Sequence, residues 1–467
     1  MSDYTTFLSK KSPLVPLAGM HDIPALPAGM KPFQAAIAGW ALRRGRAAIF
    51  AGTGLGKTVM QLSWANAIVN HAHKPILILT PLAVAEQTVA EAIRFNIPSV
   101  AYARDQSQAV TNIVVSNYER FEKFEIDRFG GIVLDESGIL KSHDGKTRSL
   151  LTERCSGLPW RLCCTATPAP NDYAELGQHA EFLGIMTFKE MLSMFFVHDG
   201  KVRAPGAEGQ DGWRLKRHAT KDFWRWLASW SVMIRSPEDL GFDGAEYALP
   251  PLLMFETRVA VEYKPSDGML FPVEARTLSE RIRARKTSAH DRVGATVGLV
   301  EAEPDEAWLI WCNLNTEADL IERQLDHLGA RQVSGSQLTE LKVDRLLGFK
   351  AGNPPIMISK PSIAGHGMNW QHCCRMAFVG LTDSFEQVYQ AIRRCWRFGQ
   401  TRSVHVHMVA SELEGAVVAN LRRKEMDYDK MLDAMSGHMR DLMRETVIGG
   451  RTAIKDYHPK RRMMTPW

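Results

Sequence analysis

The stretch that decides the fold is AGTGLGKT at residues 51–58, which continues the apolar run RAAIFA at 46–51. Thr53, Gly54 and Gly56 let the backbone wrap around a phosphate group, because glycine adopts conformations that other residues avoid. The helix-like segment that follows adds N–H groups that attract negative charge. A short strand, a glycine-rich loop and a helix in this order predict a binding site for a polyphosphate.

Two more residues of the loop extend this prediction to a nucleotide and a metal ion. Lys57 can reach the β- and γ-phosphates, and Thr58 can supply a hydroxyl ligand to Mg²⁺. Ala51 stands where the strict phosphate-loop pattern has glycine, so the match is close rather than complete. We therefore expect ATP and Mg²⁺ as cofactors.

A pair of carboxylates ends a second apolar run, GIVLDE at 131–136. We expect them at the edge of the sheet that faces the phosphate loop, with Asp135 holding Mg²⁺ and Glu136 orienting or deprotonating the attacking water. On their own, two carboxylates after a strand are more often solvated surface groups. In this order behind the phosphate loop, they indicate ATP hydrolysis.

Two arginines far along the chain can complete such a site. The segment QAIRRCWRFGQ at 390–400 carries Arg394 and Arg397 three positions apart, on one face if the segment is helical. Guanidinium groups directed at a γ-phosphate stabilise the charge of the transition state. A basic surface helix is the alternative interpretation. Because most of the chain separates this segment from the phosphate loop, the site is expected to lie between two lobes.

Length and composition suit a globular protein of two or three domains. The chain has 467 residues, 45% hydrophobic and 23% charged, with a net charge of +5 that is compatible with nucleic acid without indicating it. Seven cysteines without C-x-x-C spacing predict neither a disulfide framework nor a zinc ribbon. No signal peptide and no apolar run of membrane-spanning length is apparent, so we expect a cytoplasmic protein without membrane contact.

Apolar strands alternate with helical segments in two series, which predicts an α/β fold with two parallel sheets covered by helices. Residues between the two series are mostly helical. The predicted division is a tail at 1–30, a first lobe at 31–170, a helical insertion at 171–250, a connector at 251–304, a second lobe at 305–410 and a helical, basic extension at 411–467.

The predicted insertion contains an aromatic and basic cluster that has two interpretations. It can be a stacking platform for nucleic acid, or a helical brace packed on the first lobe. The helical spacing of the tryptophans in WRWLASW at 224–230 favours the brace. The members of the cluster are Trp213, Arg214, Lys216, Arg217, Trp224, Trp226 and Trp230.

Taken together, these segments resemble the Swi2/Snf2 group of superfamily 2 helicases and translocases. The phosphate loop matches the form A-x-x-G-x-G-K-T, and residues 390–400 match Q-A-x-x-R-x-x-R-x-G-Q. Further similar segments, in chain order, are KPFQ (31–34), TP (80–81), SNYE (116–119), LDES continuing as GILKS (134–142), TATPAPND (165–172), IRSPEDLGF (234–242), LPP (249–251) and AGHGMN (364–369).

The resemblance implies two RecA-like lobes in tandem and assigns roles to particular residues. The implied catalytic residues are Lys57, Asp135, Glu136, Gln390, Arg394 and Arg397. The implied nucleotide-binding residues are Gln34, Thr53, Gly54, Gly56, Lys57, Thr58, Gly365 and Gly367, with Thr58 and Asp135 on Mg²⁺. The implied nucleic-acid contacts are Thr80, Pro81, Ser116, Asn117 and Ser362, and Thr165 and Thr167 are implied to couple hydrolysis to movement.

Two departures from the family pattern affect the expected link to nucleic acid. Gly138 replaces the His or Asp that usually ends the D-E-A-H box. Residues 360–362, Lys-Pro-Ser, stand where motif V usually reads like Ser-Thr-Arg. One link between the two sites and one nucleic-acid contact are therefore left without their usual side chains.

We expect an ATP-dependent DNA translocase or helicase that moves on or remodels duplex or branched DNA in replication, recombination or repair. A chain with little beyond two lobes suits a compact phage or bacterial motor acting as a monomer. Two alternatives stay open, an RNA helicase with the same core and an ATP-gated nucleic-acid clamp that does not travel. The R-x-x-R-x-G-Q ending and the L-K-S continuation favour the DNA translocase.

Overall fold

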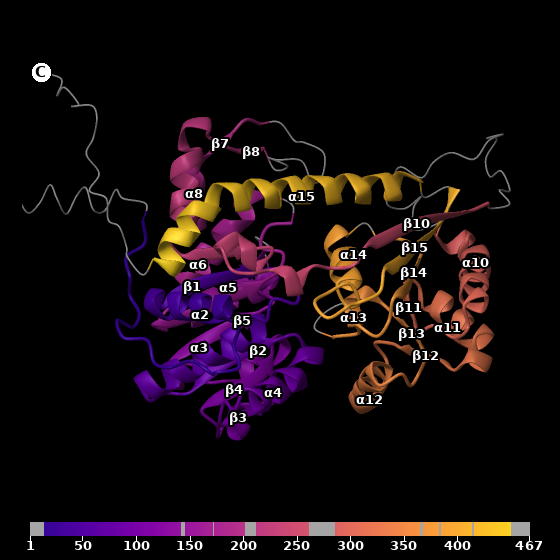
Figure 1. Ribbon diagram of the computed structural model, residues 1–467, viewed down its shortest axis with the longest axis horizontal. Coiled ribbons are helices and arrows are strands. Elements are labelled where there is room, and N and C mark those ends of the chain that lie inside the picture. The colour runs from indigo at the N-terminus through magenta and orange to yellow at the C-terminus, as the bar shows by residue number, and fades with distance from the viewer. Residues whose placement is uncertain are drawn as a thin grey trace, which may run out of the picture.

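The protein folds into two α/β lobes that lie side by side, joined by a long C-terminal helix (Figure 1). The lobe from the N-terminal half is drawn in indigo to magenta, and the second lobe in orange. The computed structural model describes residues 14–141, 145–170, 172–200, 212–260, 285–364, 368–382, 384–412 and 415–449.

The first lobe is built on a seven-stranded sheet with the order β3-β4-β2-β5-β6-β1-β9, in which neighbouring strands are parallel. The central strands are buried along their whole length, as their apolar sequences predict for a sheet covered on both faces. The strands are β1 (Arg46–Ala51), β2 (Ile76–Thr80), β3 (Val100–Tyr102), β4 (Ile113–Asn117), β5 (Gly131–Asp135), β6 (Trp160–Thr165) and β9 (Ser231–Ile234).

Helices cover this sheet, and two of them frame the phosphate loop. Helix α2 (Pro32–Arg44) comes before β1, and α3 (Lys57–Ala72) begins directly at the end of the loop. The remaining α-helices of the lobe are α4 (Ala85–Arg94), α5 (Lys146–Arg154), α6 (Leu176–Leu183), α7 (Phe188–Phe195) and α8 (Thr220–Ala228). A small antiparallel hairpin joins β7 (Phe196–His198) and β8 (Trp213–Leu215).

The segment predicted as a helical insertion contributes to the first lobe itself. Strand β9 pairs with β1 and extends the sheet beyond the boundary expected at residue 170. The tryptophans Trp224, Trp226 and Trp230 are buried at 3%, 0% and 0% exposure, within the same core as the sheet. These rings therefore support the brace interpretation, because a stacking platform needs exposed faces.

The second lobe is a six-stranded parallel sheet with the order β10-β15-β14-β11-β13-β12. Strand β10 and helix α10 come from residues expected to be a connector. Sequence reasoning missed β10 because this strand lies at the sheet edge and is half exposed. The elements are β10 (Leu252–Val259), α10 (Ala289–Ala302), β11 (Trp308–Cys312), α11 (Asn315–Gln324), β12 (Ala330–Val333), α12 (Thr339–Lys350), β13 (Ile356–Ser359), α13 (Pro361–Ala364), β14 (Arg375–Val379), α14 (Phe385–Ile392) and β15 (Val404–Ser411).

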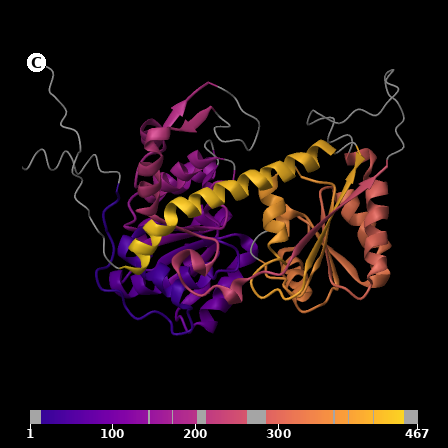
Figure 2. The same cartoon turned by 45° about the horizontal axis from the view of Figure 1, so that its top comes forward.

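Helix α15 (Gly415–Met443) leaves the second lobe after β15 and runs back across the molecule to the first lobe (Figure 2). A short π-helical segment, Arg444–Ile448, continues it. The two parallel sheets together confirm the predicted fold class of two tandem α/β lobes. Among the described residues, none of the helices combines the length and the apolar character needed to cross a membrane.

The topology brings the predicted motifs to one edge of the first sheet. The phosphate loop follows β1, the carboxylates end β5, and Thr165 ends β6, which lies between β5 and β1. Because the carboxyl ends of parallel strands share an edge, residues far apart in sequence meet there. The second lobe closes over this edge with α14 and the segment that follows it.

Candidate active site

The phosphate loop needs glycine at two positions for both backbone and packing reasons. Gly54 and Gly56 have φ values of +92° and +79°, which lie in the left-handed region. A Cβ on Gly56 would fall 2.3 Å from Nε2 of Gln34, and one on Gly54 would fall 2.8 Å from Cβ of Phe398. The loop is therefore held between α2 on one side and the second lobe on the other.

The polar groups of the loop fit a triphosphate. The partly buried Lys57 donates from Nζ to the carbonyls of Ala51 (2.9 Å) and Gly52 (3.4 Å). Burial lowers the Lys57 pKa, and the charges of Glu136 and Asp135 oppose that shift. Thr53 Oγ1 is buried without a hydrogen-bond partner among the described residues, and the first turn of α3 offers N–H groups that no helical carbonyl accepts. Phosphate oxygens would satisfy these donors.

Gln34 connects α2 to the phosphate loop. Its Nε2 donates to the Leu55 carbonyl at 3.0 Å, and its Oε1 accepts from the Lys31 amide at 3.0 Å. A glutamine amide has two donors and two acceptor positions, so one of each remains after these bonds. The residue lies beside the loop, and its role in reading adenine stays a prediction.

The two carboxylates occupy different environments at the end of β5. Asp135 accepts a 2.7 Å hydrogen bond from Nε2 of Gln61, and burial, followed by the charge of Glu136, raises the Asp135 pKa to about 6. Oε2 of Glu136 accepts from the Thr165 hydroxyl at 3.2 Å. Tyr118 donates from its hydroxyl to the Asp135 carbonyl at 2.7 Å, which fixes the backbone between the two.

The predicted arginines of the second lobe lie close enough to Glu136 for its charge to affect their pKa values. Arg394 donates from Nε to the Gln390 carbonyl at 2.9 Å and from Nη2 to Gln390 Oε1 at 3.0 Å. Arg397 donates from Nη1 to the Met368 carbonyl at 3.2 Å. Burial lowers the pKa of both guanidinium groups, that of Arg397 to about 9, and the Glu136 carboxylate partly offsets the loss in each.

A polar network joins the two lobes next to this site. Oε1 of Glu386 on α14 accepts from Lys141 Nζ at 2.5 Å and from the Thr167 hydroxyl at 3.1 Å. Gln390 donates from Nε2 to the same Thr167 oxygen at 3.4 Å. Thr167 and Lys141 belong to the first lobe, so Glu386 and Gln390 connect its strand ends to α14.

In this network, Lys141 occupies the space next to Gly138, which has no side chain. A Cβ on this glycine would lie 3.0 Å from Lys141 Nζ and 3.5 Å from Glu386 Oε1. Lys141 therefore uses the space that a longer residue at position 138 would fill. In the sequence, Lys141 stands within GILKS without a pattern that predicts a role for it, and the position of Glu386 four residues before Gln390 is its only signal.

The side chains predicted to contact nucleic acid in the first lobe lie at the ends of the paired strands β2 and β4. Thr80 and Ser116 are fully buried, and their hydroxyls donate to the carbonyls of Pro81 and Ala103. Asn117 bonds to Glu119 and Tyr102. These side chains stabilise the strand ends in this conformation, and their role in phosphate contact stays a prediction.

The predicted contacts of the second lobe are only partly described. Ser362 lies exposed on the short helix α13. Gly365 and Gly367, predicted to bind nucleotide, lie outside the described residues.

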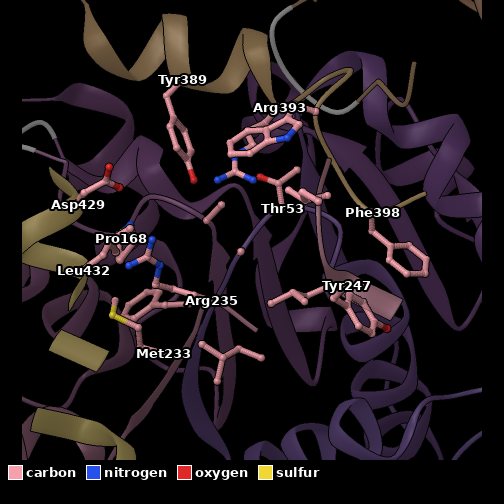
Figure 3. A pocket seen from close by; sticks show the side chains of 17 residues that line it. Thr53, Pro168, Met233, Arg235, Tyr247, Tyr389, Arg393, Phe398, Asp429 and Leu432 are labelled. Atoms are coloured by element: carbon pink, nitrogen blue, oxygen red, sulfur yellow. The ribbon is translucent and has the colours of Figure 1, made fainter. Parts of the chain in front are cut away.

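A cavity of about 290 Å³ lies between the phosphate loop, α14 and α15 (Figure 3). Its lining includes Gly52 and Thr53 but not Lys57, Asp135 or Glu136. The Arg393 guanidinium is 5.1 Å from the ring centre of Tyr389 and 4.3 Å from that of Trp396, which keeps it at the wall of the cavity. The cavity therefore lies beside the start of the phosphate loop, with residues of α14 and α15 on its other sides.

The fold and this site define a two-lobed, nucleic-acid-dependent ATPase of the helicase type. An SNF2-related domain matches residues 34–198, and a helicase conserved C-terminal domain matches residues 291–399. The chain belongs to the Snf2-like group of superfamily 2, which confirms the predicted family and the predicted enzyme class.

The chain was also compared with curated proteins and with solved structures. No curated protein matches the chain. Among solved structures, it is similar to the Sulfolobus solfataricus SWI2/SNF2 ATPase core in complex with dsDNA, with 18% identity over 91% of this chain and 98% of that chain and a TM-score of 0.40.

Proposed function

We propose that the protein is an ATP-dependent DNA translocase that moves on, or remodels, duplex or branched DNA in replication, recombination or repair. One observation carries this proposal: a phosphate loop and two carboxylates in one lobe lie near the buried Arg394 and the half-buried Arg397 of the other, and a polar network joins the lobes at that point. Such an arrangement can convert nucleotide binding into movement of the lobes.

ATP supplies the γ-phosphoryl group and Mg²⁺ neutralises charge on the phosphates. Lys57 and the first turn of α3 would hold the phosphates, while Thr58 and Asp135 would hold the cation. Gln34 would contact the base. The remaining assignments, Thr53, Gly54 and Gly56 around the phosphates and Gly365 and Gly367 in the second lobe, rest on the family pattern.

The catalytic groups act from both lobes. Glu136 would orient the attacking water and take up its proton, because its carboxylate is held by Thr165 next to the phosphate loop. Arg394 and Arg397 would stabilise the charge that develops at the γ-phosphate, and Gln390 fixes Arg394 by two hydrogen bonds. Because residues of both lobes would hold ATP, it would bind the closed arrangement better than an open one.

DNA is the proposed track because the R-x-x-R-x-G-Q and L-K-S segments and the SNF2-related domain favour the duplex translocases of the superfamily. The expected contacts are with the phosphate backbone and are therefore largely independent of sequence. They would come from residues 80–81 and 116–117 of the first lobe and from Ser362 of the second.

The test is steady-state ATP turnover with no nucleic acid, double-stranded DNA, single-stranded DNA and RNA, with Glu136→Gln as the blank. Strong stimulation by duplex DNA supports the proposal, and triplex displacement would then show movement. Stimulation by RNA alone would replace it with an RNA helicase. Binding of DNA without any increase in turnover would replace it with an ATP-gated clamp.

A further inference from the structure

Helix α15 is in contact with both lobes. Near its start, Arg422 donates from Nη2 to Glu256 of β10 at 2.9 Å, in the second lobe. Near its end, the Ser436 hydroxyl donates to Asp239 at 3.2 Å, in the first lobe, and Met443 is fully buried. The helix spans the junction between the lobes in both views (Figures 1 and 2).

Tyr428, midway along α15, lies where the two lobes meet. Its hydroxyl donates to the Ala166 carbonyl of the first lobe at 3.1 Å. Its ring lies 5.5 Å from the ring centres of both Phe385 and Tyr389, on α14 of the second lobe. The residue is 1% exposed, and burial raises the pKa of its hydroxyl well above the ordinary value, so the hydroxyl stays a proton donor.

The carbonyl that Tyr428 binds lies between the two coupling threonines. Thr165 donates to the Glu136 carboxylate, and Thr167 donates to Glu386 of α14. Strand β6 ends at Thr165, so Ala166 lies beyond the sheet pairing that fixes the preceding residues. A hydrogen bond to this carbonyl sets the orientation of the peptide plane between the two threonines.

We propose that Tyr428 is a positioning residue for ATP hydrolysis, and that α15 is a third component of the coupling between the lobes. Through its hydrogen bond to the Ala166 carbonyl, Tyr428 holds the Thr165 hydroxyl against the Glu136 carboxylate. Its ring contacts with Phe385 and Tyr389 make its position depend on that of α14. A change in the relative position of the two lobes would then alter the position of the Glu136 carboxylate, which is proposed to orient the attacking water. This inference goes beyond the proposed function and rests on it only for stimulation by DNA.

The test compares Tyr428→Phe with Tyr389→Phe in the full-length protein. Both changes remove one hydroxyl from the same ring cluster, but only the Tyr428 hydroxyl donates to a described residue. We expect Tyr428→Phe to lower kcat for ATP by roughly fivefold, the scale of one lost hydrogen bond. The KM for ATP should stay unchanged, because the contacts of Tyr428 are with Ala166, Phe385 and Tyr389 and not with the phosphate loop. Tyr389→Phe should keep the wild-type kcat.

A third variant, Tyr428→Leu, separates positioning from packing. It removes the ring as well as the hydroxyl, so it should lower the melting temperature much more than Tyr428→Phe does, whereas kcat should fall to a similar extent in both variants. Wild-type kcat in Tyr428→Phe, or a loss of kcat that follows the fall in melting temperature across the two variants, would overturn the inference. If no nucleic acid stimulates the wild type, the proposed function fails, and the same comparison made on basal turnover still decides the role of Tyr428.

Discussion

At the scale of single residues, Glu136, the proposed water-orienting carboxylate, has an unusual backbone conformation. Its φ of +57° is left-handed, which costs a side-chain-bearing residue roughly 1–2 kcal/mol. It directly follows the last residue of β5, and its carboxylate accepts from Thr165. Strain of this kind persists where the surroundings hold it in place, most often at functional sites.

The strain at Glu136 predicts a stability difference between two inactive variants. Glu136→Gly and Glu136→Ala both remove the carboxylate, but only glycine adopts the left-handed conformation without cost. We expect Glu136→Gly to be the more stable by about 1 kcal/mol in urea denaturation. Equal stability of the two variants would show that the left-handed backbone carries no strain.

The raised pKa of Asp135 predicts an acid limit to turnover. As pH falls through about 6, the carboxylate takes up a proton and loses the charge that would hold Mg²⁺. ATP turnover should therefore decline below this pH. Because Mg²⁺ and the proton compete for the same oxygens, tenfold more Mg²⁺ should move the decline to lower pH. A decline that ignores the Mg²⁺ concentration would assign it to another group.

At the scale of elements, α14 presents two polar residues to the first lobe. Glu386 and Gln390 lie four positions apart and therefore share a face of the helix. Both bond to the Thr167 hydroxyl, and Glu386 also pairs with Lys141. Helix α14 is therefore bonded directly to the segment that follows β6. Lys141, which follows the carboxylate pair, links the two lobes although position 138 is a glycine.

This arrangement predicts that Glu386→Gln uncouples the lobes. The amide keeps the shape of the side chain but loses the charge that pairs with Lys141. We expect stimulation of ATP turnover by DNA to fall by roughly tenfold, the scale of a lost charged hydrogen bond, with basal turnover less affected. Asp326→Asn is the matched control, since Asp326 pairs with Arg331 within the second lobe. Equal effects of the two changes would argue against an interlobe role.

At the scale of the whole molecule, the site exists only where two lobes meet. Arg394 of the second lobe is buried and Arg397 is half-buried, and the pKa values of both respond to the Glu136 carboxylate of the first lobe. Phe398, which follows Arg397, lies against Gly54 of the phosphate loop and stacks on Tyr247 of the connecting segment, with 4.5 Å between ring centres. The packing of Phe398 against the phosphate loop therefore stabilises the closed arrangement of the two lobes.

An arginine acting across the lobes should matter more for turnover than for ATP binding. We expect Arg397→Ala to lower kcat on the order of a thousandfold, because arginine fingers act on the transition state. The dissociation constant for ATP should change by less than about tenfold. Arg402→Ala is the control, because Arg402 pairs with Glu306 at the surface of the same lobe. Equal losses of binding and turnover in Arg397→Ala would exclude the finger role.

The sequence by itself determined the parallel sheets, the phosphate loop, the carboxylate pair and the arginine segment. Each depends on residues within about ten positions of one another, so local chemistry and periodicity reveal it. The central apolar strands were placed closely for the same reason. The edge strands were not: β9 is short and β10 is half exposed, so neither has a strong pattern of its own.

Only the tertiary structure decided which residues connect the motifs. Glu386 bonds to residues that lie more than two hundred positions away, and so does Tyr428. No local pattern encodes a contact of that separation, because it is the packing of the two lobes and α15 that creates it. The burial of Thr80 and Ser116 was likewise hidden, since a strand-end hydroxyl can turn to the surface or to a neighbouring carbonyl and the sequence is the same for both.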